Sequence, residues 1–166
     1  YEAAAGGVNA YFETHNRNKR GIVLDLKCEA GLQAFYRLIR DADVFIQNFR
    51  PGVAERIKID YDTLREMNPR LVYCQASGFG LNGPDAERPA LDPLAQARGG
   101  LMSVTGEPDQ PPTRTFTGFA DQVSAFVLAY GVMVALFHRE RTGEGQKVDG
   151  SLLQSVIGAQ AFNITS

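Results

Sequence analysis

The chain has 166 residues, of which 44% are hydrophobic and 22% are charged. This length and balance are typical of one globular domain that can bury a core. The formal net charge of −2 argues against a general nucleic-acid-binding protein, which usually carries a basic balance or a basic stripe.

The first half of the chain predicts alternating strands and helices. Short runs rich in β-branched residues predict strands at residues 21–26, 43–47 and 71–76. Apolar spacing predicts helices at residues 30–41, 53–56 and 61–68. This order indicates an α/β fold with a parallel sheet and crossover helices, in which ligands bind at the carboxyl ends of the strands. The loops that begin at Asn48 and Ser77 lie at such ends.

The second half predicts two Pro-rich loops around residues 81–93 and 103–117, with a short helix between them. A long helix follows from about residue 120 to 139, and a strand at 147–149 precedes a last helix from residue 151. The apolar run at 125–137 is too short to span a bilayer. We therefore expect a helix that is buried in the protein and does not cross a membrane. One broad apolar stripe runs along it, formed by Val123, Phe126, Val127, Tyr130, Val134 and Phe137.

The cysteines and the N-terminal residues indicate the compartment. Cys28 and Cys74 are far apart and in no CxxC pattern, so they predict neither a disulfide framework nor a metal site. We interpret them as buried free thiols of a cytoplasmic protein. The first twenty residues lack the apolar core of a signal peptide. The last residues form an apolar helical pattern that stops abruptly, and we expect the chain to be part of a longer protein.

Asp121 is the most notable carboxylate, because it lies directly before a long apolar helix. Two interpretations stay open from its position alone. Asp121 can be an ordinary N-cap that accepts backbone N–H bonds. It can also be a nucleophile, since carboxylates form covalent intermediates in acyl chemistry.

A second group of candidate residues has side chains suited to bind a phosphate and to stack on a base. Asn48 ends a predicted strand, Phe49 follows it, and Arg56 lies about two helical turns further on. A base can stack on the phenyl ring and a phosphate can pair with the guanidinium group. The alternative is a surface turn with a solvated arginine. Lys19, Arg20 and Lys27 form a further basic group, and Arg88 and Asp92 lie together in the first Pro-rich loop.

Several short stretches, taken in order, resemble the class III CoA-transferase family, which includes formyl-CoA transferase and carnitine CoA-transferase. They include Asn18-Lys19-Arg20-Gly21, Asn48-Phe49-Arg50-Pro51-Gly52, Ser77-Gly78-Phe79-Gly80, Arg88-Pro89-Ala90-Leu91-Asp92-Pro93 and Ala120-Asp121. The resemblance covers most of the chain from about residue 12 onward.

The resemblance implies a Rossmann-like large domain, of which residues 1–166 are the N-terminal part, with the small domain absent. It implies an interlocked homodimer and acyl-CoA and carboxylic acid substrates, with no tightly bound cofactor and no metal. It assigns Asp121 as the nucleophile, which forms aspartyl-anhydride and aspartyl-CoA intermediates. It also assigns the CoA contacts to Leu24, Lys27, Asn48, Phe49 and Arg56, with Arg88 as a weaker match.

Two other functions compete with CoA transfer. The α-methylacyl-CoA racemases of the same superfamily use a Gly-His-Asp motif, which here is Ala90-Leu91-Asp92. Leucine cannot move a proton, so Leu91 disfavours two-base racemisation. The third hypothesis is a non-catalytic CoA-binding fragment.

Overall fold

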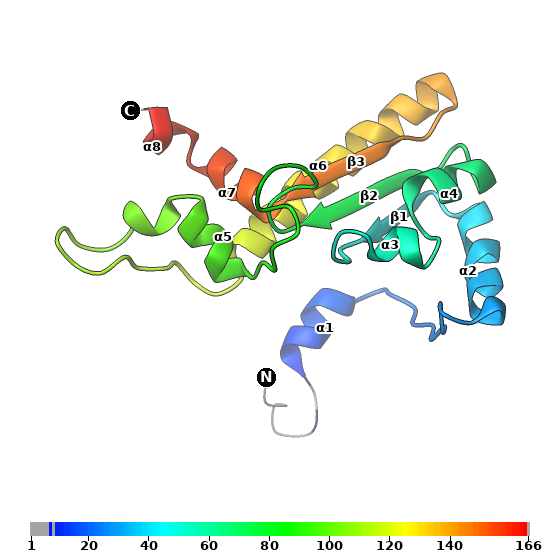
Figure 1. The fold of residues 1–166 in the computed structure, drawn as a ribbon, viewed down its shortest axis with the longest axis horizontal. Helices are drawn as coiled ribbons and strands as arrows, with labels where there is room; N and C mark the ends of the chain where they lie inside the picture. Colours follow the sequence, from blue (N-terminus) through cyan, green and yellow to red (C-terminus); the bar gives the residue numbers. More distant parts are fainter. Residues whose placement is uncertain (1–6, 8, 166) are drawn as a thin grey trace.

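The computed structural model describes residue 7 and residues 9–165, in which helices cover both faces of a parallel three-stranded sheet (Figure 1). The strands lie in the order β1-β2-β3, with Val44 opposite Val72 and Cys74 opposite Val148. This confirms the α/β class with a parallel sheet. In chain order the elements are α1 (Ala10–Asn16), α2 (Glu29–Asp41), β1 (Val44–Gln47), α3 (Val53–Arg56), α4 (Tyr61–Met67), β2 (Val72–Ser77), α5 (Asp92–Arg98), a 3₁₀ turn η1 (Leu101–Ser103), α6 (Phe119–Thr142), β3 (Lys147–Ser151), α7 (Leu152–Ala159) and α8 (Ala161–Thr165).

Alternate residues of β2 hold the two helical layers on the sheet. Tyr73 is buried against α2, α3 and α4 together with Leu32 and Leu64. Val72 and Cys74 point to the other face, where they pack on Val132 and Ala135 of α6. Because successive side chains of a strand point to opposite faces, this central strand reads as a continuous apolar run.

The strand expected at residues 21–26 is wrong, because these residues have no regular secondary structure. Ile22 and Val23 are 66% and 98% exposed. β-branched residues form a strand only where a neighbouring strand supplies a ladder and a surface to pack on. No described strand pairs with this run. The sequence also gave no sign of α1, whose residues include none that is buried.

Helix α6 is present as expected, but its expected burial is wrong. Small side chains bury one face of it against the sheet, α5 and α7; they include Ala120, Ser124 and Ala135. The predicted apolar stripe lies largely outside this contact, with Phe126 77% and Tyr130 73% exposed. Hydrophobicity predicts that a stripe will be covered, whereas close approach to a sheet selects the small side chains.

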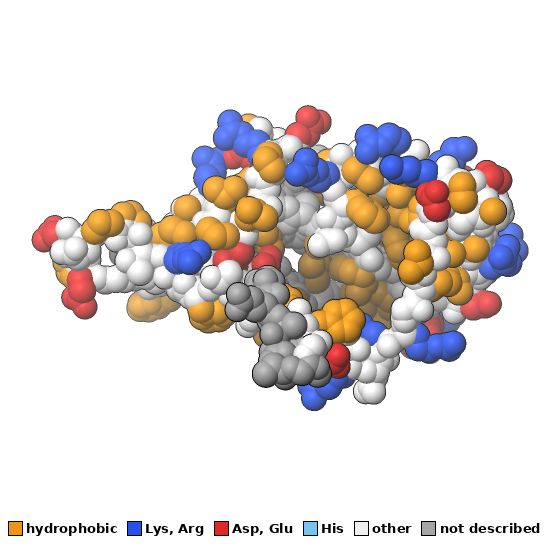
Figure 2. Space-filling view, turned by 90° about the horizontal axis from the view of Figure 1, so that it is seen from below, with side chains coloured by type: hydrophobic (Ala, Val, Ile, Leu, Met, Phe, Trp, Pro, Cys, Tyr) orange, Lys and Arg blue, Asp and Glu red, His pale blue; other side chains and the backbone are white. Residues whose placement is uncertain are grey.

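By length and composition alone, α6 could also cross a membrane, a test that core helices of soluble proteins pass too. Its packing on β2, β3, α5 and α7 makes it part of the α/β fold. Seen from below, exposed hydrophobic side chains lie both on the narrow arm at the left of the view and on the broader part at the right (Figure 2).

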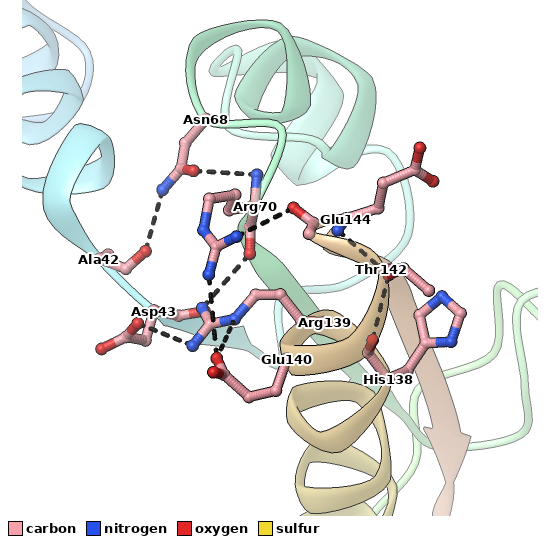
Figure 3. Close-up of polar contacts among 10 residues, drawn as sticks. Ala42, Asp43, Asn68, Arg70, His138, Arg139, Glu140, Thr142 and Glu144 are labelled. Atoms are coloured by element: carbon pink, nitrogen blue, oxygen red, sulfur yellow. Dashed lines mark hydrogen bonds and ion pairs between the residues drawn. The ribbon is translucent and has the colours of Figure 1, made fainter.

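A closed polar cluster joins the C-terminal end of α6 to the amino ends of β1 and β2 (Figure 3). Arg139 is only 8% exposed and pairs with the Asp43 carboxylate at 2.9 Å. Its guanidinium also donates to the main-chain carbonyls of Asp43 at 3.3 Å and Arg70 at 3.4 Å. Arg70 in turn donates to the carbonyl of Gly143, the residue in left-handed conformation that ends the helix. The cluster gives donors to the carbonyls of Arg70 and Gly143, whereas the carbonyl of Asp43 also accepts from the N–H of Val72.

Candidate functional site

A cavity of about 470 Å³ lies at the carboxyl ends of the strands. It is lined by the loop after β1, the end of β2, the loop before α5, and the first residues of α5, α6 and α7: Asn48, Phe49, Arg50, Pro51, Ala76, Ser77, Gly78, Ala86, Arg88, Pro89, Ala90, Leu91, Asp92, Asp121 and Leu152. This is the edge of a parallel sheet at which ligands are expected.

Asp121 lines this cavity as the third residue of α6, and the N-cap interpretation of it is wrong. The N-cap is Gly118, whose φ of 90° is in the left-handed region that favours glycine. The carboxylate that caps α6 comes instead from Asp92, whose Oδ2 accepts from the N–H groups of Ala120 at 2.6 Å and Asp121 at 3.4 Å. No hydrogen bond or ion pair to the Asp121 carboxylate is found within residues 9–165. It is therefore available to a ligand in the cavity.

The surroundings of Asp121 make its carboxylate more basic than usual. Partial burial, followed by the nearby charge of Asp92, raises the pKa of Asp121 above its ordinary value. The side chain is open to the cavity, yet the neighbouring atoms displace part of its hydration. A partly desolvated anion without a counter-ion is a better nucleophile than a paired one.

Gln47, the last residue of β1, fixes the loop that carries Asn48 and Phe49. Its side chain is buried, and its Oε1 accepts from the Phe49 N–H at 2.7 Å. Its Nε2 donates to the Tyr73 hydroxyl at 3.2 Å. Burial raises the pKa of Tyr73 to about 12, so the hydroxyl stays protonated at neutral pH. Phe49 itself is 42% exposed and lines the cavity.

The far wall of the cavity depends on a close approach between two loops. A Cβ at Gly78 would collide with the Cβ of Ala90, so only glycine allows the loop after β2 to lie there. Next to Ala90, Leu91 is 71% exposed and also lines the cavity. Arg88 pairs with Asp85 at 3.0 Å, and Asp85 also pairs with Arg98. The Arg88 guanidinium is thus anchored at the rim.

The family model described as CoA-transferase family III matches residues 1–166. The chain belongs to this family. Within residue 7 and residues 9–165, no group of three or more His, Cys, Asp or Glu side chains is arranged to hold a metal ion.

Characterised relatives carry names of the same kind. The chain is 42% identical over 158 residues to the acetyl-CoA:oxalate CoA-transferase of Acetobacter aceti, covering 95% of the chain and 41% of that protein. It is 40% identical over 147 residues to the formyl-CoA:oxalate CoA-transferase of Streptomyces avermitilis, covering 89% of the chain and 36% of that protein. The chain thus spans about two fifths of the length of these relatives.

The fold is shared with solved structures. A CAIB/BAIF family protein from Brucella suis superimposes with a TM-score of 0.92 at 38% sequence identity, covering 99% of this chain and 44% of that one. The resemblance to class III CoA-transferases in the sequence is therefore confirmed, as is the fold class.

The structure brings four of the seven predicted site residues to one cavity: Asn48, Phe49, Arg88 and Asp121. Leu24, Lys27 and Arg56 do not line it. Lys27 and Arg56 are exposed and Leu24 is half-buried, and their assigned role stays a prediction.

Sequence reasoning misplaced Asp92 and overlooked Gln47. Asp92 was expected in a loop, but it begins α5 and is only 5% exposed. Pro93, in the first turn, is the signal that could have indicated this helix start. Of the two cysteines expected to be buried, Cys74 is buried but Cys28 is exposed. The Cys28 sulfur accepts from the Gly31 N–H at the start of α2.

Proposed function

We propose that the whole protein moves CoA between an acyl-CoA and a free carboxylic acid, with Asp121 as the covalent nucleophile. The observation that carries this proposal is the Asp121 carboxylate in the cavity, which neither caps its helix nor pairs with a cation. The relatives named for acetyl-CoA:oxalate and formyl-CoA:oxalate transfer support the same class of reaction.

The proposed reaction runs through two kinds of activated aspartyl carbonyl. The Asp121 carboxylate attacks the thioester carbonyl, the C–S bond breaks, and CoA leaves as a thiolate from a mixed anhydride. The thiolate then attacks the aspartyl carbonyl and releases the donor acid, which leaves an aspartyl-CoA thioester. The acceptor carboxylate attacks this thioester and expels the thiolate again. Attack of the thiolate on the acceptor's acyl carbonyl gives the new acyl-CoA and restores Asp121.

The residues around the cavity support binding of the CoA end of the substrate. Phe49 offers an apolar ring, and Asn48 offers an amide beside it. Arg50 and Arg88 are the two cations that line the same cavity and can meet phosphate groups. Leu24, Lys27 and Arg56 are proposed to contact CoA beyond the cavity. Arg56 is the last residue of α3, the helix that follows the cavity-lining loop at residues 48–51.

Leu91 weighs against a racemase. Two-base racemisation needs a second group that exchanges a proton with the substrate. Leu91 lines the cavity at the position where the racemase motif has its histidine, and no histidine among the described residues lines the cavity. The other carboxylate there, Asp92, already accepts hydrogen bonds at both oxygens.

For the whole protein we propose a cytoplasmic, interlocked homodimer without a tightly bound cofactor. The exposed apolar stripe of α6 supports a covered surface in that assembly, because large exposed apolar patches mark interaction sites. Sedimentation of the full-length protein tests the dimer, and a monomer at micromolar concentration would contradict it.

Trapping the intermediate tests the proposed function directly. The full-length protein is incubated with a panel of acyl-CoAs and hydroxylamine, and the modified residue is located by mass spectrometry. A hydroxamate on Asp121 is expected. Asp62 is a matched control, since it also lies in the first turn of a helix, α4, but outside the cavity. An unmodified Asp121, with solvent deuterium entering the α-carbon of the acyl-CoA, would favour proton-transfer chemistry instead.

A further inference from the structure

Asp92 is a buried carboxylate whose two oxygens bond to α5 and to the first turn of α6, next to Asp121. Its Oδ2 accepts from the N–H groups of Ala120 and Asp121, at 2.6 and 3.4 Å. Its Oδ1 accepts from Nε2 of Gln96, one turn further along α5, at 2.7 Å. Both oxygens of the side chain are therefore used, and one of them holds the first turn of α6.

Gln96 extends this connection to the segment that leads into α6. It is fully buried, and its Oε1 accepts from the N–H of Thr115 at 3.0 Å and from its hydroxyl at 3.1 Å. Its Nε2 also donates to the carbonyl of Phe116 at 3.3 Å. The Asp92–Gln96 pair thus fixes both the approach to α6 and its first turn.

This arrangement replaces the ordinary cap of a helix. Gly118, at the N-cap, has no side chain, and no residue of α6 caps its own first turn. The cap comes instead from a carboxylate 28 residues earlier in the chain. A remote cap adds a hydrogen-bonded tie between the helix start and α5, which a local cap would not supply.

We propose that Asp92 is a positioning residue for Asp121: its carboxylate ties the first turn of α6 to α5 and thereby fixes the Asp121 side chain in the cavity. This inference rests on the proposed function of Asp121 as the nucleophile. Attack on a carbonyl needs the reacting atoms held within a narrow range of distance and angle, so a movable helix start would slow the reaction. Asp92 itself takes no part in the bond changes.

A second consequence concerns charge. The charged side chains that line the cavity with Asp121 are Arg50 and Arg88 from the loops and Asp92 from α5, and α7 contributes only Leu152. Burial is the larger cause of the raised pKa of Asp121, and among these charged side chains the Asp92 carboxylate adds to it. Removing the Asp92 charge is therefore expected to lower the pKa of Asp121.

The test replaces Asp92 by asparagine in the full-length protein. Asparagine keeps the size of the side chain but offers one acceptor oxygen in place of two, so it cannot hold both Gln96 and the first turn of α6. We expect kcat to fall about 10- to 100-fold while KM for acyl-CoA changes by less than about threefold. The acid limb of the kcat profile should move to lower pH. Residue-resolved hydrogen exchange should show faster exchange at the N–H of Ala120.

Asp60→Asn is the matched control. Asp60 is a local carboxylate cap, at the N-cap of α4, accepting from the Thr63 N–H at 3.1 Å and its hydroxyl at 2.8 Å, and it lies outside the cavity. This variant should lose stability without a change in kcat or in the acid limb. Equal kcat losses in both variants, or an unmoved acid limb in Asp92→Asn, would overturn the proposal.

The exchange readout is independent of activity. If no acyl-CoA is turned over by the wild type, the proposed nucleophile fails, but exchange at Ala120 still reports whether Asp92 holds the helix. If Asp92→Asn does not fold, hydrogen exchange in the wild-type protein alone tests whether Asp92 caps α6. Its Ala120 N–H should exchange more slowly than that of Phe119, whereas equal rates at the two would overturn the cap.

Discussion

The two ends of α6 hold charged side chains in opposite ways. At the C-terminal end, Arg139 is surrounded by a carboxylate and two main-chain carbonyls (Figure 3). At the N-terminal end, two carboxylates lie near each other, and only Asp92 is hydrogen-bonded. In the first cluster the cation is paired with a carboxylate, and this cluster lies at the amino ends of the strands. The other is incomplete and lies at the carboxyl ends, where it lines a cavity.

The difference separates a structural cluster from one that we propose to be reactive. The dipole of a helix favours an anion at its N-terminus and a cation at its C-terminus. Arg139 and Asp92 both satisfy this preference. Asp121 lies at a helix start whose N–H groups already donate to Asp92, so these groups stabilise the Asp121 anion little. The same physical rules therefore stabilise one end and leave a basic, unpaired carboxylate at the other.

The largest effect is expected when the unpaired carboxylate is removed. Asp121→Ala should lower the rate of CoA transfer at least about 10³-fold, because loss of a covalent nucleophile leaves only binding and positioning. Binding of CoA, measured by calorimetry on the full-length protein, should change by less than about threefold, since the removed group acts in the bond changes. Asp62→Ala, an exposed first-turn aspartate on α4, is the control and should keep full activity. Activity retained in Asp121→Ala would show that the unpaired carboxylate at the N-terminal end of α6 is not the nucleophile.

Unpaired cations should behave like the unpaired carboxylate and serve the ligand. Arg56 is exposed and forms no ion pair with any residue at positions 9–165. Arg56→Ala should weaken CoA binding by about 1.5–3 kcal/mol, the worth of a charge-assisted hydrogen bond. Arg65→Ala is the control, because Arg65 lies over the ring of Tyr61 on α4 and away from the cavity. If calorimetry gives equal affinities for Arg56→Ala and wild type, the CoA contact at Arg56 is disproved.

The paired cation should matter for stability and not for chemistry. Arg139→Met leaves the carbonyls of Asp43 and Arg70 without this donor, and we expect a loss of about 1–3 kcal/mol in the free energy of unfolding. The kcat of the folded fraction should stay unchanged. Arg141 is an exposed residue two positions further along α6 and lies over the ring of Phe137. The free energy of unfolding of Arg141→Met should fall by less than about 0.5 kcal/mol. Denaturant titration measures both losses. A lower kcat in folded Arg139→Met would contradict the purely structural role of Arg139.

The sequence predicts local features of this molecule better than its long-range contacts. Helix α3 and the strands around Asn48 and Ser77 follow from nearby residues, and so did the placement of Asp121 at a helix start. The remote cap of α6 by Asp92 could not be predicted, because it joins residues far apart in sequence. The exposure of Phe126 and Tyr130 was missed for a similar reason, since periodicity marks an apolar face without saying what covers it.

The smallest expected effect concerns the stability cost of Asp121 itself. Its pKa in the folded protein lies above its unfolded value, so the folded state binds the proton more tightly than the unfolded state does. That contribution to stability is present below the ordinary aspartate pKa of about 3.9 and is lost as the pH rises through the raised folded value. Near neutral pH the ionised Asp121 therefore destabilises the fold relative to a neutral side chain.

Asp121→Asn should accordingly raise the free energy of unfolding near neutral pH. Because the side chain is open to the cavity, solvent reduces the gain to a few tenths of a kcal/mol, in the range of about 0–1 kcal/mol found for exposed charges. Denaturant unfolding of the full-length protein, repeated close to pH 3.9, should show the difference shrink as the wild-type carboxylate takes up its proton. A gain that persists unchanged at that pH would trace to packing and not to charge. A loss at neutral pH would mean that the helix start favours the Asp121 anion after all, and the two ends of α6 would then differ less than their contacts imply.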